Sequence, residues 1–142
     1  MIEFCDLAEI RRKIDSHRDK VLLVNHFATW CGGCVDEMPL IVRLHQEMPD
    51  VAFLGVTWEL FVDHRPHAEV EADLRAFVDE QGIQFPILVY TGTPGELMSA
   101  LEIEPQTIPH TVVHGPGGGV VSRFTTTLEE PDLPTVRAAL QG

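Results

Sequence analysis

The sequence predicts an α/β fold in which helices cover both faces of a mixed central sheet. Short apolar runs alternate with segments of helical spacing along most of the 142 residues. Such alternation is typical of a sheet with parallel middle strands and helices on both faces. Near the end, five turn residues, Gly115–Gly119, separate two short apolar runs and predict an antiparallel C-terminal hairpin. A chain of this length fits one domain, residues 1–142, with its own core.

The expected elements follow one another without a domain-sized linker, in the order (β)αβαβαβ(α)ββα. Asp6 and Glu9 form a capping-box pair at the first helix, and Gly82 stands where a helix ends. Pro39 lies inside the second helix and is expected to kink it. Helices are expected at 6–16, 34–48, 67–81, 95–101 and from 132 onward, and strands at 21–27, 51–57, 86–90, 107–114 and 120–124.

The charge and composition of the chain limit the kinds of partner that it can bind. The net charge of −12 argues against nucleic acid and against an acidic membrane surface. We find no run long enough to span a membrane. The first residues, Met1 to Asp6, lack the basic and apolar regions of a signal peptide. We therefore expect the chain as written in the cytoplasm, while a mature domain outside the cytoplasm stays open if a leader was removed.

The clearest chemical signal is the pair Cys31-Gly32-Gly33-Cys34, which comes directly after an apolar run and directly before a helical pattern. A thiol at a helix N-terminus can have its pKa lowered from about 8.5 to between about 3.5 and 7.5. Cys31 is therefore the candidate nucleophile, and Cys34 is close enough to form a disulfide with it. Cys5, the third cysteine, has no partner in the pattern and is expected to be a small buried hydrophobe.

These residues, together with later ones, resemble the thioredoxin superfamily, and most closely its TlpA-like thiol–disulfide oxidoreductases. The resemblance implies a thioredoxin-like fold and dithiol–disulfide exchange. It also implies a cis Ile108–Pro109 bond that faces Cys31 and presents the backbone of Ile108 to an extended substrate segment. The similarity covers nearly the whole chain from about residue 21, and its motifs are Val21-Leu22-Leu23-Val24-Asn25, Ala28-Thr29-Trp30-Cys31-Gly32-Gly33-Cys34, Glu37-Met38-Pro39, Leu54-Gly55-Val56, Phe85-Pro86-Ile87-Leu88 and Ile108-Pro109.

The chain departs from thioredoxin at the residues that would tune the chemistry. Thioredoxin commonly has Gly-Pro between its cysteines, where this chain has two glycines, so the redox potential cannot be transferred. Thioredoxin also has a buried acid where this chain has Asn25. Glu37, three residues after Cys34, is the replacement candidate for accepting the Cys34 proton, and the alternative is a solvated first-turn glutamate. His26 and His110 stand near the dithiol by alignment, either as structural histidines or, when protonated, as groups that favour the Cys31 thiolate.

The resulting hypothesis is a two-step exchange in which the chain is expected to act as a reductase. Cys31 attacks a disulfide of a protein or small molecule, and Cys34 then resolves the mixed disulfide. Trp30, Ile108, Pro109 and His110 are the expected substrate-binding residues. We expect a monomer that uses a separate redox donor and no bound organic cofactor.

Three other interpretations are open at this stage. Cys31 and Cys34 with His64 and His67 offer four zinc-type ligands, although the two pairs lie about thirty residues apart. A peroxidase on the same fold and a redox-inactive interaction domain are the others. The segment 58–67 is either a surface loop or, through Trp58, Glu59 and Phe61, part of a substrate groove at the carboxyl edge of the sheet.

Overall fold

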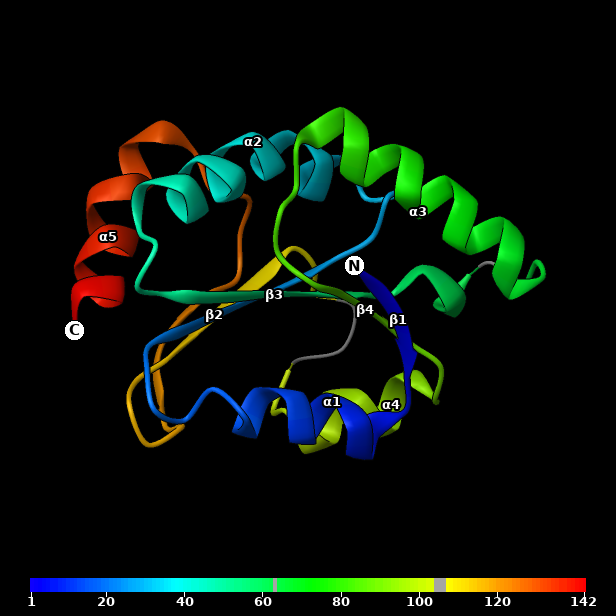
Figure 1. The fold of residues 1–142 in the computed structure, drawn as a ribbon, viewed down its shortest axis with the longest axis horizontal. Helices are drawn as coiled ribbons and strands as arrows, with labels where there is room; N and C mark the ends of the chain where they lie inside the picture. Colours follow the sequence, from blue (N-terminus) through cyan, green and yellow to red (C-terminus); the bar gives the residue numbers. More distant parts are fainter. Residues whose placement is uncertain (63, 104–106) are drawn as a thin grey trace.

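A computed structural model of the chain describes residues 1–62, 64–103 and 107–142. Position 63, inside the expected loop 58–67, and positions 104–106 lie outside the described residues. The elements follow the predicted order, with a six-stranded sheet between two layers of helices (Figure 1). The strands are β1 (Ile2–Cys5), β2 (Leu22–Phe27), β3 (Ala52–Thr57), β4 (Ile87–Tyr90), β5 (His110–His114) and β6 (Val120–Phe124).

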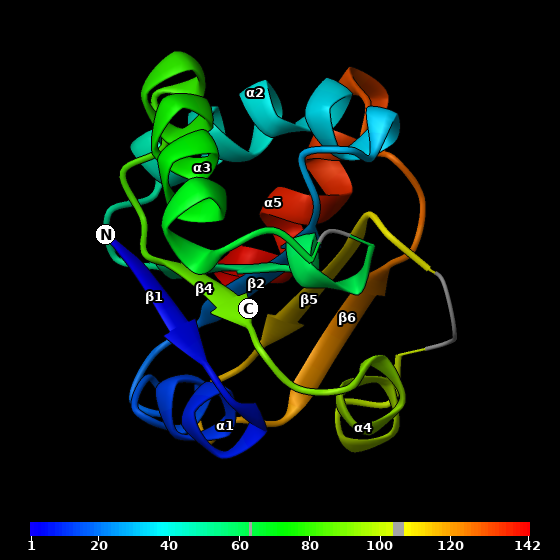
Figure 2. The ribbon, with the colours of Figure 1, turned by 90° about the vertical axis from the view of Figure 1, so that its right-hand side faces the viewer.

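The sheet is mixed, as predicted. Its strand order is β1-β4-β3-β2-β5-β6. The first four strands in this order pair in parallel, whereas β5 runs antiparallel to both β2 and β6. Figure 2 shows β5 and β6 side by side as the expected hairpin. The sheet thereby places β2 at its centre, with the parallel β3 on one side and the antiparallel β5 on the other.

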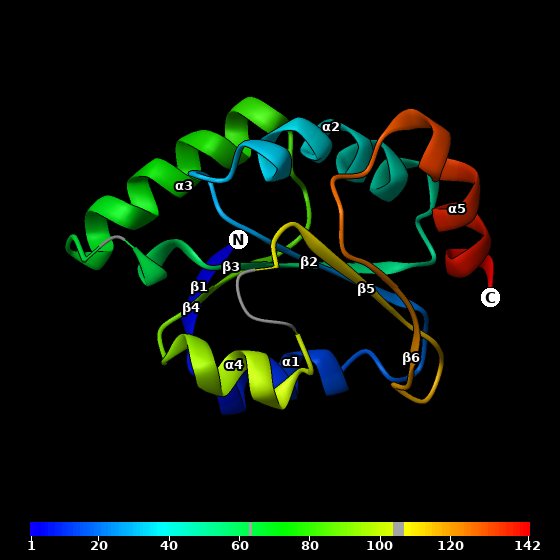
Figure 3. The same ribbon diagram turned by 180° about the vertical axis from the view of Figure 1, so that it is seen from behind.

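The helices form one layer on each face of the sheet. In Figures 1 and 3, α2, α3 and α5 cover one face, and α1 and α4 cover the other. Of the described residues, none belongs to a helix that combines the length and the apolar character needed to cross a membrane. The bounds are α1 (Leu7–Asp15), α2 (Gly32–Glu47), α3 (His67–Gln81), α4 (Pro94–Ala100) and α5 (Leu133–Gln141).

Strand β2 is buried along its whole length because both faces of the sheet are covered. Leu23 packs into the apolar cluster beneath α2 and α5. Its neighbours Leu22 and Val24 pack into the cluster beneath α1 and α4. Successive side chains of a strand point to opposite faces, so a strand covered on both sides buries apolar residues on each of them. This explains the unbroken apolar run from which the strand was predicted.

Two predicted helix ends, the start of α1 and the end of α3, are confirmed, because each depends on residues close together in the chain. The Glu9 N–H donates to Asp6 Oδ1 at 2.8 Å, and the Asp6 N–H donates to Glu9 Oε1 at 3.1 Å, which completes the capping box. Gly82 ends α3 in the left-handed conformation, with φ of 72°. Two 3-10 turns, η1 (Glu59–Phe61) and η2 (Glu130–Asp132), were not predicted. Three residues are too few to show a periodicity.

The parallel arrangement brings two connections together at one edge of the sheet. The loop after β2 leads into α2, and the loop after β3 leads into η1. The N–H of Trp58, just after β3, donates to the carbonyl oxygen of Phe27, the last residue of β2, at 2.9 Å. The carboxyl ends of adjacent parallel strands therefore place the cysteine turn beside η1.

Candidate active site

The two cysteines lie at the N-terminus of α2 and are joined in a disulfide, with 5.2 Å between their Cα atoms. Cys31 is the N-cap residue, and its Sγ accepts a hydrogen bond from the Cys34 N–H at 3.3 Å. Cys31 is half-buried, whereas Cys34 is fully buried. A substrate disulfide can therefore reach only Cys31 directly. The Cys34 N–H, in the first turn of the helix, is the kind of donor that lowers the pKa of a thiol such as Cys31.

The second glycine of the turn is required by its surroundings. A Cβ atom at Gly33 would collide with the Thr127 hydroxyl oxygen, and it would lie 3.5 Å from Cδ of Pro109. A Cβ atom at Gly32 would meet no heavy atom within 4 Å. The segment around Thr127 thus packs directly over the dithiol turn. The proline that thioredoxin commonly has at this position has no room here.

The loop before β5 faces the same turn. The Ile108–Pro109 peptide bond is cis, as the resemblance implied. Pro109 is buried, and its ring lies near Gly33. Ile108 is half-buried and lines a cavity together with Cys31. The backbone of Ile108 and the exchanging sulfur are therefore neighbours, as a loop that presents an extended substrate would require.

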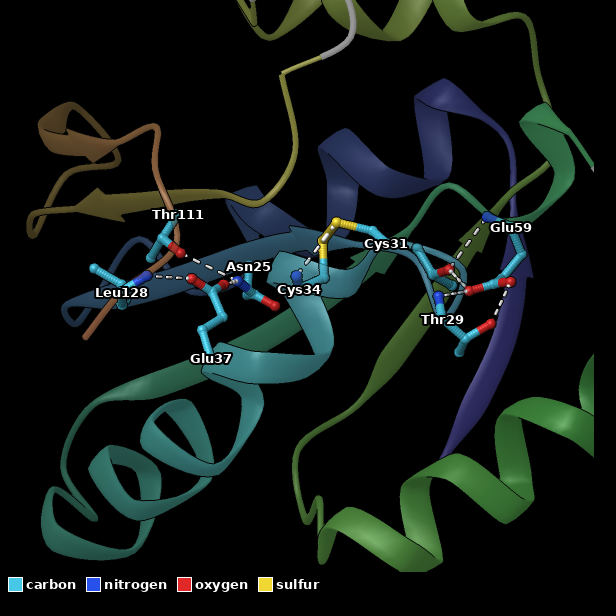
Figure 4. The surroundings of a disulfide bond; sticks show 9 residues. Asn25, Thr29, Cys31, Cys34, Glu37, Glu59, Thr111 and Leu128 are labelled. Carbon is cyan, nitrogen blue, oxygen red and sulfur yellow. Dashed lines mark hydrogen bonds between the residues drawn. A yellow bond between two sulfur atoms is a disulfide. The ribbon is translucent and has the colours of Figure 1, made fainter. Parts of the chain in front are cut away.

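Glu37 is completely buried, so it is not a solvated first-turn glutamate. Its Oε2 accepts a hydrogen bond from Asn25 Nδ2 at 2.8 Å, and its Oε1 accepts one from the Leu128 N–H at 2.9 Å. Asn25 also donates to Thr111 Oγ1 at 3.1 Å. Figure 4 shows this network on the Cys34 side of the disulfide.

The environment of Glu37 suits proton exchange at neutral pH. Burial raises the pKa of the Glu37 carboxyl from its usual 4.5 to about 7, although the hydrogen bonds from Leu128 and Asn25 act in the opposite direction. A general base works best when its pKa lies near the working pH. The carboxyl thus has the properties expected of an acceptor for a proton from the neighbouring dithiol.

The surroundings of His26 and His110 favour the structural alternative, because burial lowers the pKa of both imidazoles. Burial, reinforced by nearby positive charge, lowers the pKa of His26 to about 3, and its Nδ1 accepts a hydrogen bond from Trp58 Nε1 at 3.3 Å. Burial and the Arg123 guanidinium lower the pKa of His110 to about 4. These pKa shifts argue against a protonated histidine that favours the Cys31 thiolate.

His110 is one of the expected substrate-binding residues. Its side chain is 2% exposed, and its Nε2 lies 3.2 Å from Nη1 of Arg123. Arg123 is anchored in turn by a hydrogen bond from Nη2 to the Leu101 carbonyl oxygen at 3.2 Å. The side chain of His110 is thus held within the structure, and contact of this residue with a substrate stays a prediction.

An apolar groove with a volume of about 590 Å³ opens beside Cys31. Trp30, which is 47% exposed, forms part of its wall. Trp58 and Phe61 also line it, in agreement with the groove hypothesis. Glu59 does not line it: this side chain is buried and turns toward Thr29 and Thr57. Its full set of lining residues is Trp30, Cys31, Trp58, Phe61, Val62, Pro94, Met98 and Ile108.

The third cysteine, Cys5, lies outside the dithiol pair. Cys5 is free and buried, and burial together with nearby carboxylates raises the pKa of its thiol to about 11. It is therefore the inert, buried thiol that was predicted.

Within the described ranges, no three His, Cys, Asp or Glu side chains are grouped so that they could hold a metal ion. A zinc site built from Cys31, Cys34, His64 and His67 is therefore contradicted.

Several residues at the site were not found by sequence reasoning. Thr127 packs against the dithiol turn, Leu128 donates a hydrogen bond to Glu37, and Thr111 accepts one from Asn25. Thr29 lies inside the recognised motif, but its bond to Glu59 was not predicted. No motif marks Thr127, because its contact with Gly33 exists only after the C-terminal segment folds back over α2.

Comparison with known proteins shows several thioredoxin-like relatives, although no protein-family model matches the chain. The thioredoxin-like protein YneN of Bacillus subtilis is 33% identical over 79 residues, which are 56% of this chain and 44% of that protein. The thiol-disulfide oxidoreductase ResA of Geobacillus kaustophilus is 24% identical over 130 residues, or 90% of this chain and 67% of the relative. The chain thus spans from less than half to about two thirds of the length of these relatives.

Solved structures show the same fold over most of the chain. A DsbF homologue from Corynebacterium diphtheriae superposes with a TM-score of 0.70 at 19% identity, covering 89% of this chain and 76% of the other. A thioredoxin-related protein from Neisseria meningitidis has a TM-score of 0.66 at 25% identity, with 87% of each chain covered. The six-stranded sheet and its helices are therefore a thioredoxin-like architecture.

Proposed function

We propose that this chain, which is similar to thiol-disulfide oxidoreductases over 90% of its length and has a thioredoxin-like fold, exchanges the Cys31–Cys34 dithiol with disulfides of protein or small-molecule substrates, as a reductase. The observation that carries the proposal is the asymmetry of the pair. A half-buried Cys31 at a helix N-terminus is joined to a fully buried Cys34. One sulfur is thereby reserved for substrate and the other for resolution.

The proposed cycle begins with the reduced enzyme. The Cys31 thiolate attacks one sulfur of the substrate disulfide, which forms a mixed disulfide and releases the first substrate thiolate. Cys34, after losing its proton, attacks Sγ of Cys31. This step forms the Cys31–Cys34 disulfide and releases the second substrate thiolate. A separate dithiol donor then reduces the enzyme and so supplies the two electrons of each turnover.

Glu37 is the proposed acceptor of the Cys34 proton, directly or through water. The carboxyl lies on the Cys34 side of the disulfide, with a pKa of about 7 that lets it both accept and release a proton near neutral pH (Figure 4). In this role it takes the place of the buried acid that thioredoxin has at the position of Asn25. Asn25 holds the carboxylate in place through its 2.8 Å hydrogen bond.

The reductase direction is supported by the lowered pKa values of His26 and His110, which keep these two side chains from adding positive charge near the site. Strong oxidants of this class have an unusually stabilised thiolate in the reduced form. Here the Cys34 N–H donates to Cys31 Sγ, while the two histidines near the site are held neutral by burial. A thiolate with modest stabilisation makes the disulfide harder to reduce, and the dithiol a better reductant.

The groove beside Cys31 is the proposed docking surface for the substrate. Trp30 and Ile108 flank the exchanging sulfur, and Trp58 and Phe61 extend the apolar wall away from it. An extended segment that carries apolar side chains next to its disulfide would match this surface. We further propose that the chain works as a monomer, and that it works in the cytoplasm.

The reduction potential of the Cys31–Cys34 pair tests the proposed direction. Equilibration in dithiothreitol or glutathione buffers, with the oxidised fraction measured by thiol labelling, should give a value near the roughly −270 mV of thioredoxin. A value near about −120 mV would instead assign the chain to the oxidases. Cys31→Ser and Cys34→Ser variants that kept full disulfide-reducing activity would contradict the mechanism itself.

A further inference from the structure

A second buried carboxylate lies at the dithiol turn, on the side opposite Glu37. Glu59, in η1, is 4% exposed. Its Oε2 accepts a hydrogen bond from Thr29 Oγ1 at 2.8 Å, and its Oε1 accepts one from the Thr29 N–H and another from Thr57 Oγ1 at 3.1 Å. The proposed cycle gives this group no proton to carry. Figure 4 shows it on the Cys31 side of the disulfide.

The residue held by Glu59 lies two positions before the nucleophile. Thr29 belongs to the loop between β2 and α2, and the Cys31 N–H closes this loop by donating to the Ala28 carbonyl oxygen at 3.2 Å. Glu59 thus accepts hydrogen bonds from both the backbone and the side chain of Thr29, which lies inside this tight turn. Displacement of Thr29 would displace Cys31, because the turn leaves few torsions between them.

The chemistry of the contact favours a carboxylate over any apolar residue. A carboxylate has two oxygens that only accept, and here they accept from two hydroxyls and one backbone N–H. Burial of such a group is costly unless its oxygens are hydrogen-bonded. The hydroxyl of Thr57 completes the arrangement, since it also accepts from the Glu59 N–H at 3.2 Å. The side chain is therefore fixed at both ends.

We propose that Glu59 is a positioning residue for the exchange reaction, an inference that rests on the proposed function. It ties the turn that carries Cys31 to η1, whose flanking Trp58 and whose Phe61 line the substrate groove. One side chain thereby fixes the position of the nucleophile relative to the groove wall. We call the hydrogen bonds from Thr29 and Thr57 to Glu59 the clamp. With the clamp in place, Cys31 stays at the N-terminus of α2, where the Cys34 N–H reaches its sulfur.

The proposal is tested by separating the shape of Glu59 from its charge. Glu59→Ala removes every clamp bond. Glu59→Gln keeps most of them, because its oxygen can accept from the Thr29 N–H and from Thr57, while its amide can donate to the Thr29 hydroxyl. Thr29→Val is a milder change that removes one bond and retains the shape of the turn. Glu80→Ala, at an exposed position on α3, is the matched control for loss of a negative charge.

Two readouts are needed, both on folded protein. The first is the pH profile of alkylation of Cys31 by iodoacetamide in a Cys34→Ser background, and the second is kcat/KM for reduction of a peptide disulfide. Glu59→Ala should raise the apparent pKa of Cys31 and lower kcat/KM about tenfold, because a small misplacement of a reacting atom costs one to two orders of magnitude. Glu59→Gln and Glu80→Ala should stay within about twofold of the wild type, and Thr29→Val should lie between.

The outcomes separate this inference from the proposed function. A wild-type chain without disulfide-reducing activity would contradict the proposed function, while the alkylation profiles would still test the clamp. Unchanged profiles and unchanged kcat/KM in Glu59→Ala would overturn the positioning role. A loss in Glu59→Gln as large as that in Glu59→Ala would overturn it too, since charge would then matter in place of position. If Glu59→Ala fails to fold, wild-type behaviour of Thr29→Val counts against the clamp.

Discussion

Replacement of Glu37 by glutamine should remove a specific part of the pH dependence of stability. The pKa of this carboxyl is about 7 in the folded chain against its usual 4.5. At about 1.4 kcal/mol for each pKa unit, the difference corresponds to about 3 kcal/mol. Because the folded pKa is the higher one, the unfolded chain loses its proton first as the pH rises. Ionisation of Glu37 therefore lowers the free energy of unfolding progressively between about pH 4.5 and pH 7.

Glu37→Gln has no such loss, because glutamine stays neutral throughout. Denaturant unfolding of the oxidised proteins at pH 4.5, 6, 7 and 8 should show the difference in unfolding free energy, variant minus wild type, rising by about 3 kcal/mol across this range. The difference cancels the titrations that both proteins share. In the same variant, resolution of the mixed disulfide should slow about 10²-fold or more, as expected for loss of a general base. A difference that stays flat with pH would refute the argument that Glu37 is buried with a raised pKa.

Two further predictions concern the residues around the turn. Gly33→Ala should destabilise the oxidised chain by about 1–3 kcal/mol through overpacking against Thr127, and Thr127→Ala should restore most of the loss in the double variant. Gly32→Ala is the control with free space, and an equal loss there in urea unfolding would contradict the packing argument. Arg123→Gln should raise the pKa of His110 above about 4, yet leave it below 6.5 because the imidazole stays buried. An NMR titration of the imidazole protons that showed no change would exclude the guanidinium as a cause.

The fold could be predicted from the sequence because its signals are local. The apolar run of β2 reflects a strand covered on both faces, and Asp6 with Glu9 forms a cap within four residues. The dithiol was equally visible, since Cys31 and Cys34 lie within one turn of helix. Patterns of this kind depend on neighbours in the chain, and the tertiary structure leaves them unchanged.

The wider site could not be predicted in the same way, because its partners are distant in the chain. The i+3 spacing placed Glu37 on the correct side of α2, but its burial depends on Leu128, 91 residues later. The alignment placed His110 near the dithiol, whereas its low pKa results from burial first and from Arg123 of β6 second. Glu59 was a candidate for the groove wall under one of two alternatives, and it instead turns inward, since Thr29, thirty residues earlier, supplies two of its donors.

Capture of the mixed disulfide tests the central claim, that Cys31 exchanges with substrate and Cys34 resolves the product, most directly. The reduced Cys34→Ser variant, incubated with a peptide disulfide and quenched with acid, should carry one peptide thiol on Cys31, as read by mass spectrometry of the digest. The wild-type chain should instead accumulate the Cys31–Cys34 disulfide and release both peptide thiols. An adduct on Cys5, or no adduct in the variant while the wild-type chain still reduces the peptide, would contradict the account.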